Sequence, residues 1–421
     1  IGRIGCQVDD AKGFDKFSAA IQDLNSDVSI GLSTGGDSDF RIFLGRPEFI
    51  LKKQALTASR FVPSVIGLYH DWRGGIKIFA NQDDLNLFLA RLADTYSSTD
   101  ADFPAENRTG EVFSICLTGA LCAMEVIKLS LGIGVTEGDF LYLDLLTMEF
   151  LKAGKEELAA ALHKLGALKH RHCPKMKLSD KKVLIVGTGG LGSPAAYALA
   201  RAGIGTLGLV DYDVVEISNL QRQILHATSR LGMSKVESAT IFLKNLNPQL
   251  RVNSYNISLN KANVFDIFAG YDAVIDGVDN FPTRFLLNDA CFLAKKPLID
   301  AGVIRFDGTC QTIIPQGPCY RCTLPAIPSP GSIPSCSESG VLSPLPGIMG
   351  FIQAAETAKL LLDLGRVLSD RTIFFDGLAS EFLTIKISKN PTCPLCGANP
   401  TIHELQEYGF VCSDTVTEKK D

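Results

Sequence analysis

The stretch KVLIVGTGGLGSP, residues 182–194, decides the fold. Residues 183–186 are β-branched or apolar and predict a buried strand, the glycines after them predict a tight turn, and the alanine-rich residues 194–202 predict a helix. Gly187, Gly189 and Gly192 fit the G-x-G-x-x-G pattern, in which backbone N–H groups at the start of a helix face a phosphate. The stretch therefore predicts strand, turn and helix, with a nucleotide at the turn.

The residues that follow extend this pattern. Residues 203–210 predict the next strand, which ends in Asp211, about 20 residues after the last glycine, where a carboxylate can bind ribose hydroxyls. Strands and helices alternate to about residue 300, which is typical of a parallel sheet with helices on both faces. A glycine turn without a ligand is the alternative, but the order of strand, turn, helix and acid favours a nucleotide. We predict an α/β fold with a Rossmann-like, doubly wound sheet.

Length and composition narrow the class of protein. The 421 residues allow two or three domains, and 46% hydrophobic with 21% charged residues is typical of globular proteins. A net charge of -5, without a basic patch bearing aromatic residues, argues against a nucleic-acid partner. No apolar run reaches the ~18 residues of a membrane span. The chain begins at Ile1 without Met or a signal-peptide pattern, as a fragment would.

The first half of the chain resembles the second. Four segments match in the same order: 21–27 with 243–249, 61–67 with 296–302, 119–129 with 350–360, and 139–144 with 371–376. Before residue 152 there is no glycine-rich phosphate loop. We expect helices at 17–24, 47–60 and 119–131 and strands at 41–44, 65–69, 75–79 and 140–150. The first half is therefore interpreted as a shortened copy that binds no ATP.

These patterns divide the chain into four parts. We expect a loop-lacking copy of the fold at 1–152, a helical and basic linker at 153–180, a nucleotide-binding domain at 181–412 and a disordered tail at 413–421.

Polar residues after the predicted strands suit a triphosphate. Arg222 can pair with a phosphate as a planar fork, and Asn219 and Gln223 can donate amide hydrogens. Lys235 begins a predicted helix and can reach a β- or γ-phosphate, and Asp279 follows a buried strand where it can hold Mg²⁺. Taken singly, each fits a polar surface loop as well, and Asp276 fits a structural role.

Two C-x-x-C pairs form a second signal. Four thiolates, from Cys319, Cys322, Cys393 and Cys396, can close tetrahedrally around a structural Zn²⁺. The long separation of the pairs exceeds usual finger spacing, and a redox C-x-x-C is the alternative. Twelve cysteines in a chain of this length favour metal or thiol chemistry in a reducing cytoplasm over disulfides.

Together these motifs resemble the MoeB/ThiF/HesA family, the bacterial relatives of ubiquitin-activating enzymes, over about residues 180–410. The resemblance rests on GTGGLG at 187–192, Asp211-x-Asp213, SNLQRQ at 218–223, GMSK at 232–235 and Asp279-Asn280-Phe281-x-x-Arg284. It implies that ATP-Mg adenylates the C-terminal glycine of a ubiquitin-like sulfur carrier with a Gly-Gly end, such as MoaD or ThiS. It also strengthens the zinc interpretation, because family members carry the same paired knuckles.

The resemblance implies a role for each matching residue. Those expected to bind the nucleotide are Gly187, Gly189, Gly190, Gly192, Asp211, Asp213, Asn219, Arg222, Gln223, Lys235, Asp279 and Asn280. Arg222, Lys235 and Asp279 are expected to act in catalysis, and Cys336, in a Ser/Pro/Gly-rich segment, matches the loop cysteine that some members use to accept the carrier.

One family feature is not matched. The family supplies an arginine to the partner subunit's ATP from a segment before the glycine loop, and here only Arg171 lies nearby, in unlike surroundings. We expect either a homodimer or an intramolecular pseudo-dimer in which the first half acts as the partner.

Two other functions remain open. A catalytically inactive scaffold that docks a ubiquitin-like protein fits the missing arginine. An NAD-dependent dehydrogenase shares only the glycine loop and Asp211, and leaves Arg222, Lys235, Asp279 and the cysteine pairs unexplained.

Overall fold

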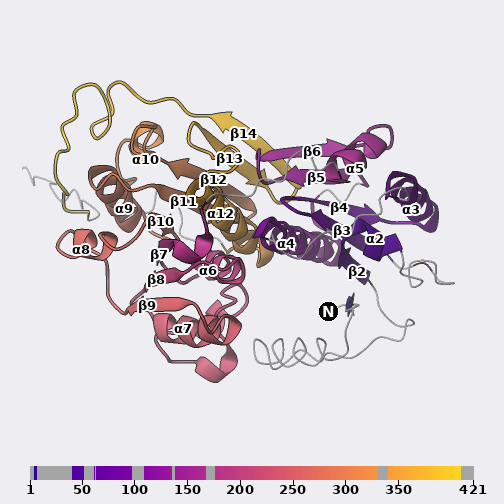
Figure 1. Ribbon diagram of the computed structural model, residues 1–421, viewed down its shortest axis with the longest axis horizontal. Helices are drawn as coiled ribbons and strands as arrows, with labels where there is room; N and C mark the ends of the chain where they lie inside the picture. Colours follow the sequence, from indigo (N-terminus) through magenta and orange to yellow (C-terminus); the bar gives the residue numbers. More distant parts are fainter. Residues whose placement is uncertain are drawn as a thin grey trace, which may run out of the picture.

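The computed structural model describes residues 4–6, 40–51, 61, 63–96, 109–134, 138–166, 176–329 and 340–408. It contains two sheets side by side, one in the first half (up to residue 166) and one in the second half (from residue 176), as Figure 1 shows. Both mix parallel and antiparallel strands and carry helices, so the predicted α/β fold with parallel strands is confirmed.

The eight-stranded sheet of the second half has the order β14-β13-β12-β11-β10-β7-β8-β9. Its strands are β7 (Lys182–Val186), β8 (Thr206–Val210), β9 (Arg251–Tyr255), β10 (Ala273–Asp276), β11 (Leu298–Ile304), β12 (Asp307–Ile313), β13 (Arg371–Asp376) and β14 (Glu381–Lys386). The five strands from β9 to β11 pair in parallel, and β11 to β14 are antiparallel.

Alternating residues of β7 explain why both faces of this sheet are covered. Val183 and Ile185 belong to one buried cluster and Leu184 and Val186 to another. The first cluster includes residues of α6 (Gly192–Arg201), α7 (Lys235–Leu246) and α12 (Pro344–Leu362). The second includes residues of α8 (Val264–Phe268) and α9 (Phe281–Leu293).

The sheet of the first half has the order β1-β2-β3-β4-β5-β6. Its strands are β1 (Ile4–Cys6), β2 (Phe40–Gly45), β3 (Ser64–His70), β4 (Arg73–Phe79), β5 (Phe140–Asp144) and β6 (Glu149–Ala153), and its helices are α2 (Pro47–Leu51), α3 (Gln82–Tyr96), α4 (Thr109–Leu131) and α5 (Leu158–Gly166). β1 to β3 are parallel and β3 to β6 antiparallel. The series β7-β10-β11-β12-β13-β14 has the same order and the same pairing directions.

Matching details recur at matching places in the two sheets. The Oδ1 atoms of Asp144 and Asp376 each accept hydrogen bonds from backbone N–H groups two and three residues on. The hairpin turns that follow contain Met148 and Ser380 at φ 54° and 52°. Three of the four matched pairs of segments lie wholly or partly in these elements. In the fourth, residues 243–249 include the end of α7 (Lys235–Leu246), but residues 21–27 lie outside the described residues, as does the predicted helix at 17–24.

Some predicted bounds change. The single strand predicted at 140–150 is wrong, because the turn held by Asp144 splits it into the hairpin β5–β6. The helix predicted at 119–131 begins earlier, at Thr109. Of the helix predicted at 47–60, residues 47–51 are described and helical.

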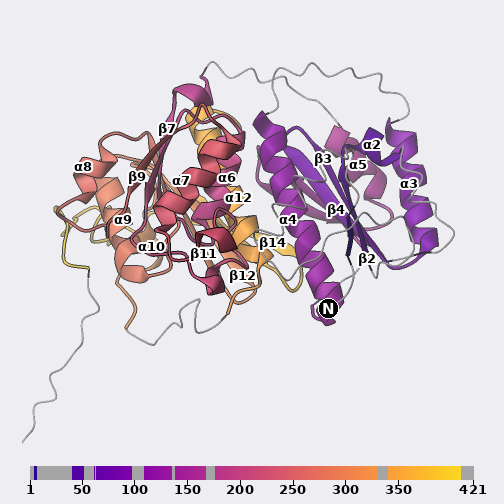
Figure 2. The same ribbon diagram turned by 90° about the horizontal axis from the view of Figure 1, so that it is seen from below.

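The halves meet through α4 and α12, which pack against each other between the sheets (Figures 1 and 2). Their apolar residues belong to one continuous buried cluster. Phe150 of β6 stacks on Phe382 of β14 at 3.9 Å between ring centroids, and Lys152 Nζ lies 3.0 Å from Glu381 Oε1. By length and composition α4 could cross a membrane, but 56% of its apolar window is buried, so we interpret it as a core helix.

Candidate nucleotide site

The glycine loop follows β7 at the carboxyl edge of the parallel strands. Gly187 has φ +89°, and a Cβ added there would lie 2.6 Å from the carbonyl oxygen of Gly277, just after β10. Gly192 begins α6, and a Cβ there would lie 1.8 Å from the carbonyl oxygen of Gly187. Only glycine fits both positions, because the loop folds tightly against β10 and against its own helix.

Asp211, at the end of β8, holds this loop. Its Oδ2 accepts hydrogen bonds from Thr188 N at 2.8 Å and Thr188 Oγ1 at 3.0 Å, and its Oδ1 accepts one from Asp213 N at 3.0 Å. The carboxylate predicted to meet ribose is thus already bonded to the loop.

Lys235 is the first residue of α7 and its side chain is buried. Its Nζ lies 2.8 Å from Oδ2 of the half-exposed Asp213, and its N–H donates to Asp213 O at 2.9 Å. The predicted cation and one predicted acid therefore form an ion pair beside the loop.

The segment between Asp213 and Lys235 places two polar side chains beside glycines of the loop. Gln223 is buried, and its Nε2 lies 3.6 Å from the place of a Cβ on Gly189. Its Oε1 is buried and has no hydrogen-bond partner among the described residues. The Cδ of Arg222 lies 3.6 Å from the place of a Cβ on Gly190. Asn219 instead closes a 3₁₀ turn, where its Oδ1 accepts a hydrogen bond from Glu216 N at 3.1 Å.

Asp279 and Asn280 differ in what they do. Asp279 is exposed after β10 and forms no hydrogen bond or ion pair with the described residues. Asn280 is the N-cap of α9, where its Oδ1 accepts from Thr283 N at 3.0 Å. The Asp279 carboxylate is thus exposed and unpaired among the described residues, while the Asn280 side chain caps a helix.

A buried ion-pair cluster lies beneath this edge. Arg284 Nε is 3.5 Å from Asp276 Oδ2, and Arg284 Nη1 is 3.2 Å from Asp300 Oδ1. Burial raises the pKa of Asp276, Arg284 opposes this and Asp300 adds to it, so that the pKa is about 7. Asp276 has no access to solvent and forms an ion pair with Arg284, which favours the structural role over the functional one.

The four cysteines of the two C-x-x-C pairs come together. Their Sγ atoms all lie within 4.8 Å of one another, with Cys319 and Cys393 3.6 Å apart and Cys322 and Cys396 3.3 Å apart. A tetrahedral site with Zn–S bonds of 2.3 Å needs sulfur atoms ~3.8 Å apart, so this set of donors fits Zn²⁺.

The first C-x-x-C pair, Cys319 and Cys322, is fixed to α9 by the arginine between its cysteines. Arg321 donates from Nε and Nη2 to the two carboxylate oxygens of Asp289, both at 2.8 Å, and Tyr408 OH donates to Asp289 Oδ2 at 2.7 Å. This bidentate pair joins the cysteine cluster to the helix that Asn280 begins.

One predicted site residue, Cys336, cannot be placed, and two residues beside the loop were not predicted. Cys336 and Arg171 lie outside the described residues. Thr188 and the buried His226, whose Nε2 lies 3.0 Å from Thr188 O, contact the loop. No spacing in the sequence indicates this contact, because the two residues are far apart in the chain.

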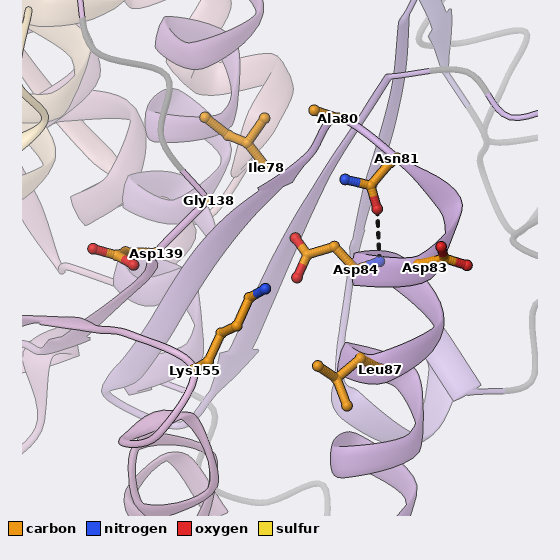
Figure 3. Close-up of a pocket in the computed structure, with 9 residues that line it drawn as sticks. All are labelled: Ile78, Ala80, Asn81, Asp83, Asp84, Leu87, Gly138, Asp139 and Lys155. Carbon is orange, nitrogen blue, oxygen red and sulfur yellow. Dashed lines mark hydrogen bonds between the residues drawn. The ribbon is translucent and has the colours of Figure 1, made fainter.

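A cavity of about 490 Å³ lies elsewhere, in the first half. Figure 3 shows Asp84 and Leu87 of α3 on one side of it and Asp139 and Lys155 on the other. None of the predicted site residues lines it.

Comparison with known proteins gives a consistent set of relatives. Residues 163–395 match the ThiF family. The chain is 47% identical over 241 residues to the SAMP-activating enzyme E1 of Haloferax volcanii, in a match that covers 57% of this chain and 89% of that protein. It is also 47% identical over 248 residues to the adenylyltransferase and sulfurtransferase MOCS3 of Drosophila virilis, which covers 58% of this chain and 55% of that protein. The chain thus spans about half the length of the MOCS3 relatives.

Among solved structures, the crystal structure of E. coli MccB with ATP matches with a TM-score of 0.49 and 17% sequence identity. That match covers 79% of this chain and 97% of that one.

Proposed function

The chain belongs to the ThiF family, and from this we propose that it is an ATP-dependent adenylyltransferase acting on the C-terminal glycine of a ubiquitin-like sulfur carrier. The names of two relatives, an adenylyltransferase and a SAMP-activating enzyme, support this function. The observation that carries it is the meeting of the glycine loop, Gln223 and the Lys235–Asp213 pair at one edge of the sheet.

The reaction suits these side chains. A carboxylate oxygen of the carrier attacks the α-phosphorus of ATP, the bond to pyrophosphate breaks, and a carrier–AMP anhydride forms. Charge moves onto the leaving pyrophosphate, so the site needs cations and N–H donors and no side-chain nucleophile. Arg222 and Lys235 supply the cations and the loop supplies the N–H groups.

Asp279 is the residue that we propose holds Mg²⁺. Its carboxylate is exposed, unpaired among the described residues and two residues from Gly277, which touches the loop. Mg²⁺ commonly takes one or two carboxylates together with substrate phosphates. When bound, it would neutralise phosphate charge during the reaction.

The four cysteines would hold Zn²⁺ as a structural ion. Four thiolates fill all positions of a tetrahedral site and leave none for substrate. The Arg321–Asp289 pair would then hold α9 in place against the metal-bound C-x-x-C pairs.

We also propose that the two halves are related, with the first a degenerate copy spanning 1–152, a linker at 153–180, the adenylation domain at 181–412 and a tail at 413–421. The shared order and directions of six strands support this division. Packing of α4 on α12 supports an intramolecular pseudo-dimer, which would work in the cytoplasm. Cys336 as acceptor of the carrier remains a proposal of the same kind.

A direct experiment is to incubate the chain with ATP-Mg and carriers of the MoaD and ThiS types, and to look for the carrier–AMP adduct by mass spectrometry. A carrier that lacks its final glycine is the matched control. The proposal predicts an adduct on one intact carrier only. ATP binding without any adduct would favour the inactive scaffold, and binding of NAD in place of ATP would favour the dehydrogenase.

A further inference from the structure

A buried histidine supports the glycine loop from inside the second half. His226 is fully buried, with Nε2 3.0 Å from Thr188 O and Nδ1 3.0 Å from Ser238 Oγ of α7. Its own N–H donates to Gln223 O at 3.0 Å. The imidazole of His226 thus contacts the loop and α7, and the backbone N–H of His226 contacts the segment that carries Gln223.

The partners determine which ring nitrogen carries the proton. A carbonyl oxygen can only accept, so Nε2–H of His226 donates to Thr188 O. Arg230 Nε donates to Ser238 Oγ at 3.0 Å, which leaves the hydroxyl proton of Ser238 to donate to Nδ1. The chain of bonds from Arg230 to Thr188 is complete with a neutral imidazole.

The bond to Thr188 O fixes the orientation of a whole peptide. In a trans peptide the carbonyl oxygen and the following N–H point in opposite directions. Because His226 and Ser193 Oγ, at 2.8 Å, both hold Thr188 O inward, the N–H of Gly189 points away from them. That N–H finds no acceptor among the described residues, and the side chain of Gln223 lies beside Gly189.

The same imidazole also sets the position of α7 relative to the loop. Ser238 lies three residues after Lys235, within the first turn of α7. The bond from His226 to Ser238 therefore ties the start of the helix that carries the cation to the loop that carries the N–H donors.

We propose that His226 is a positioning residue that holds the Thr188–Gly189 peptide so that the Gly189 N–H faces the phosphates of the nucleotide. This inference rests on the proposed function, because it takes a nucleotide to be the ligand. It concerns the phosphates alone, so the adenosine part of the ligand should not depend on it.

Two amide substitutions separate the two bonds of the ring. Glutamine places its amide nitrogen near the position of Nε2 and can still donate to Thr188 O, whereas asparagine reaches only the position of Nδ1. Affinity for ATP-Mg and for adenosine would be measured by calorimetry on the full chain and on His226→Gln and His226→Asn. A lost bond to a buried carbonyl predicts an ATP affinity about tenfold lower in His226→Asn. His226→Gln should stay within about threefold of the unsubstituted chain, and adenosine should bind equally to all three.

Other results would overturn the inference. Equal ATP affinity in His226→Asn and the unsubstituted chain would exclude a role in orientation. An equal loss for ATP and adenosine in both variants would assign His226 a general structural role, and melting temperatures of the variants would check that comparison. Failure of the unsubstituted chain to bind ATP would instead contradict the proposed function.

Discussion

At the scale of single residues, the hydrogen bonds of Thr188 explain how the loop keeps its shape. Its N–H and hydroxyl donate to Asp211, and its carbonyl accepts from Ser193 and His226. The G-x-G-x-x-G motif predicts the tight loop, because the need for residues without a side chain is a local requirement. It does not predict His226, since a lone histidine carries no pattern and its contact depends on how distant segments fold together.

The buried His226 should make stability depend on pH. Burial lowers the pKa of His226, the bond to Thr188 O opposes this, and the charges of Lys235 and Arg230 add to it, so that the pKa is about 4. Between pH 6.5 and 4 the unfolded chain binds a proton that the folded chain does not, so stability falls as the pH falls through this range. The difference in pKa corresponds to about 3 kcal/mol at pH 4.

Urea denaturation of the full chain and of His226→Gln at several pH values would measure this effect. We expect the free energy of unfolding of the unsubstituted chain to fall more steeply below pH 6.5 than that of the variant. Parallel pH profiles would show that His226 titrates normally in the fold.

At the scale of elements, the sequence predicts strand, turn and helix at 182–194 because periodicity and glycine punctuation are local. It does not predict the break in 140–150, where alternation continues through a hairpin turn. That turn depends on Asp144, whose carboxylate accepts hydrogen bonds from two backbone N–H groups. In the sequence, an aspartate that holds a turn looks the same as an aspartate within a strand.

A glycine-to-alanine substitution tests the close packing of the loop between β7 and α6. In Gly192→Ala the new Cβ would lie 1.8 Å from Gly187 O, so the loop must move. We expect a loss of roughly 1–3 kcal/mol in unfolding free energy, together with loss of ATP binding. Gly270→Ala is the control, because nothing lies within 4 Å of its Cβ. Normal ATP binding by Gly192→Ala would contradict this loop geometry.

The two C-x-x-C pairs should bind one metal ion together. Metal analysis of the purified chain should give one Zn²⁺ per chain, lost in Cys393→Ser, with a melting temperature lower by roughly 5–10 °C. Cys291→Ala is the control, since Cys291 is buried outside the cluster and should leave the metal in place. Retention of the metal by Cys393→Ser would exclude this site.

At the scale of the whole molecule, six strands follow the same order in the two sheets, but the glycine-rich loop occurs in the second half alone. Matches such as 139–144 with 371–376 predict the shared hairpins, because the aspartates and alternating residues recur. How the halves pack cannot be predicted from these matches. The packing of α4 on α12 and the Lys152–Glu381 pair join residues whose proximity no local pattern indicates.

This arrangement predicts one nucleotide site per chain. Since α4 already covers α12, the full chain should sediment as a monomer and bind a single ATP. Analytical ultracentrifugation and calorimetry would measure both values. Two ATP molecules per chain would show that the first half also binds nucleotide.

The measurement that tests the central claim most directly is the exchange of labelled pyrophosphate into ATP in the presence of a Gly-Gly carrier. The account predicts exchange that depends on one type of carrier and falls roughly 100-fold or more in Asp279→Ala, because that variant lacks the proposed Mg²⁺ ligand. Absence of exchange with every Gly-Gly carrier, in a chain that binds ATP-Mg, would contradict the account.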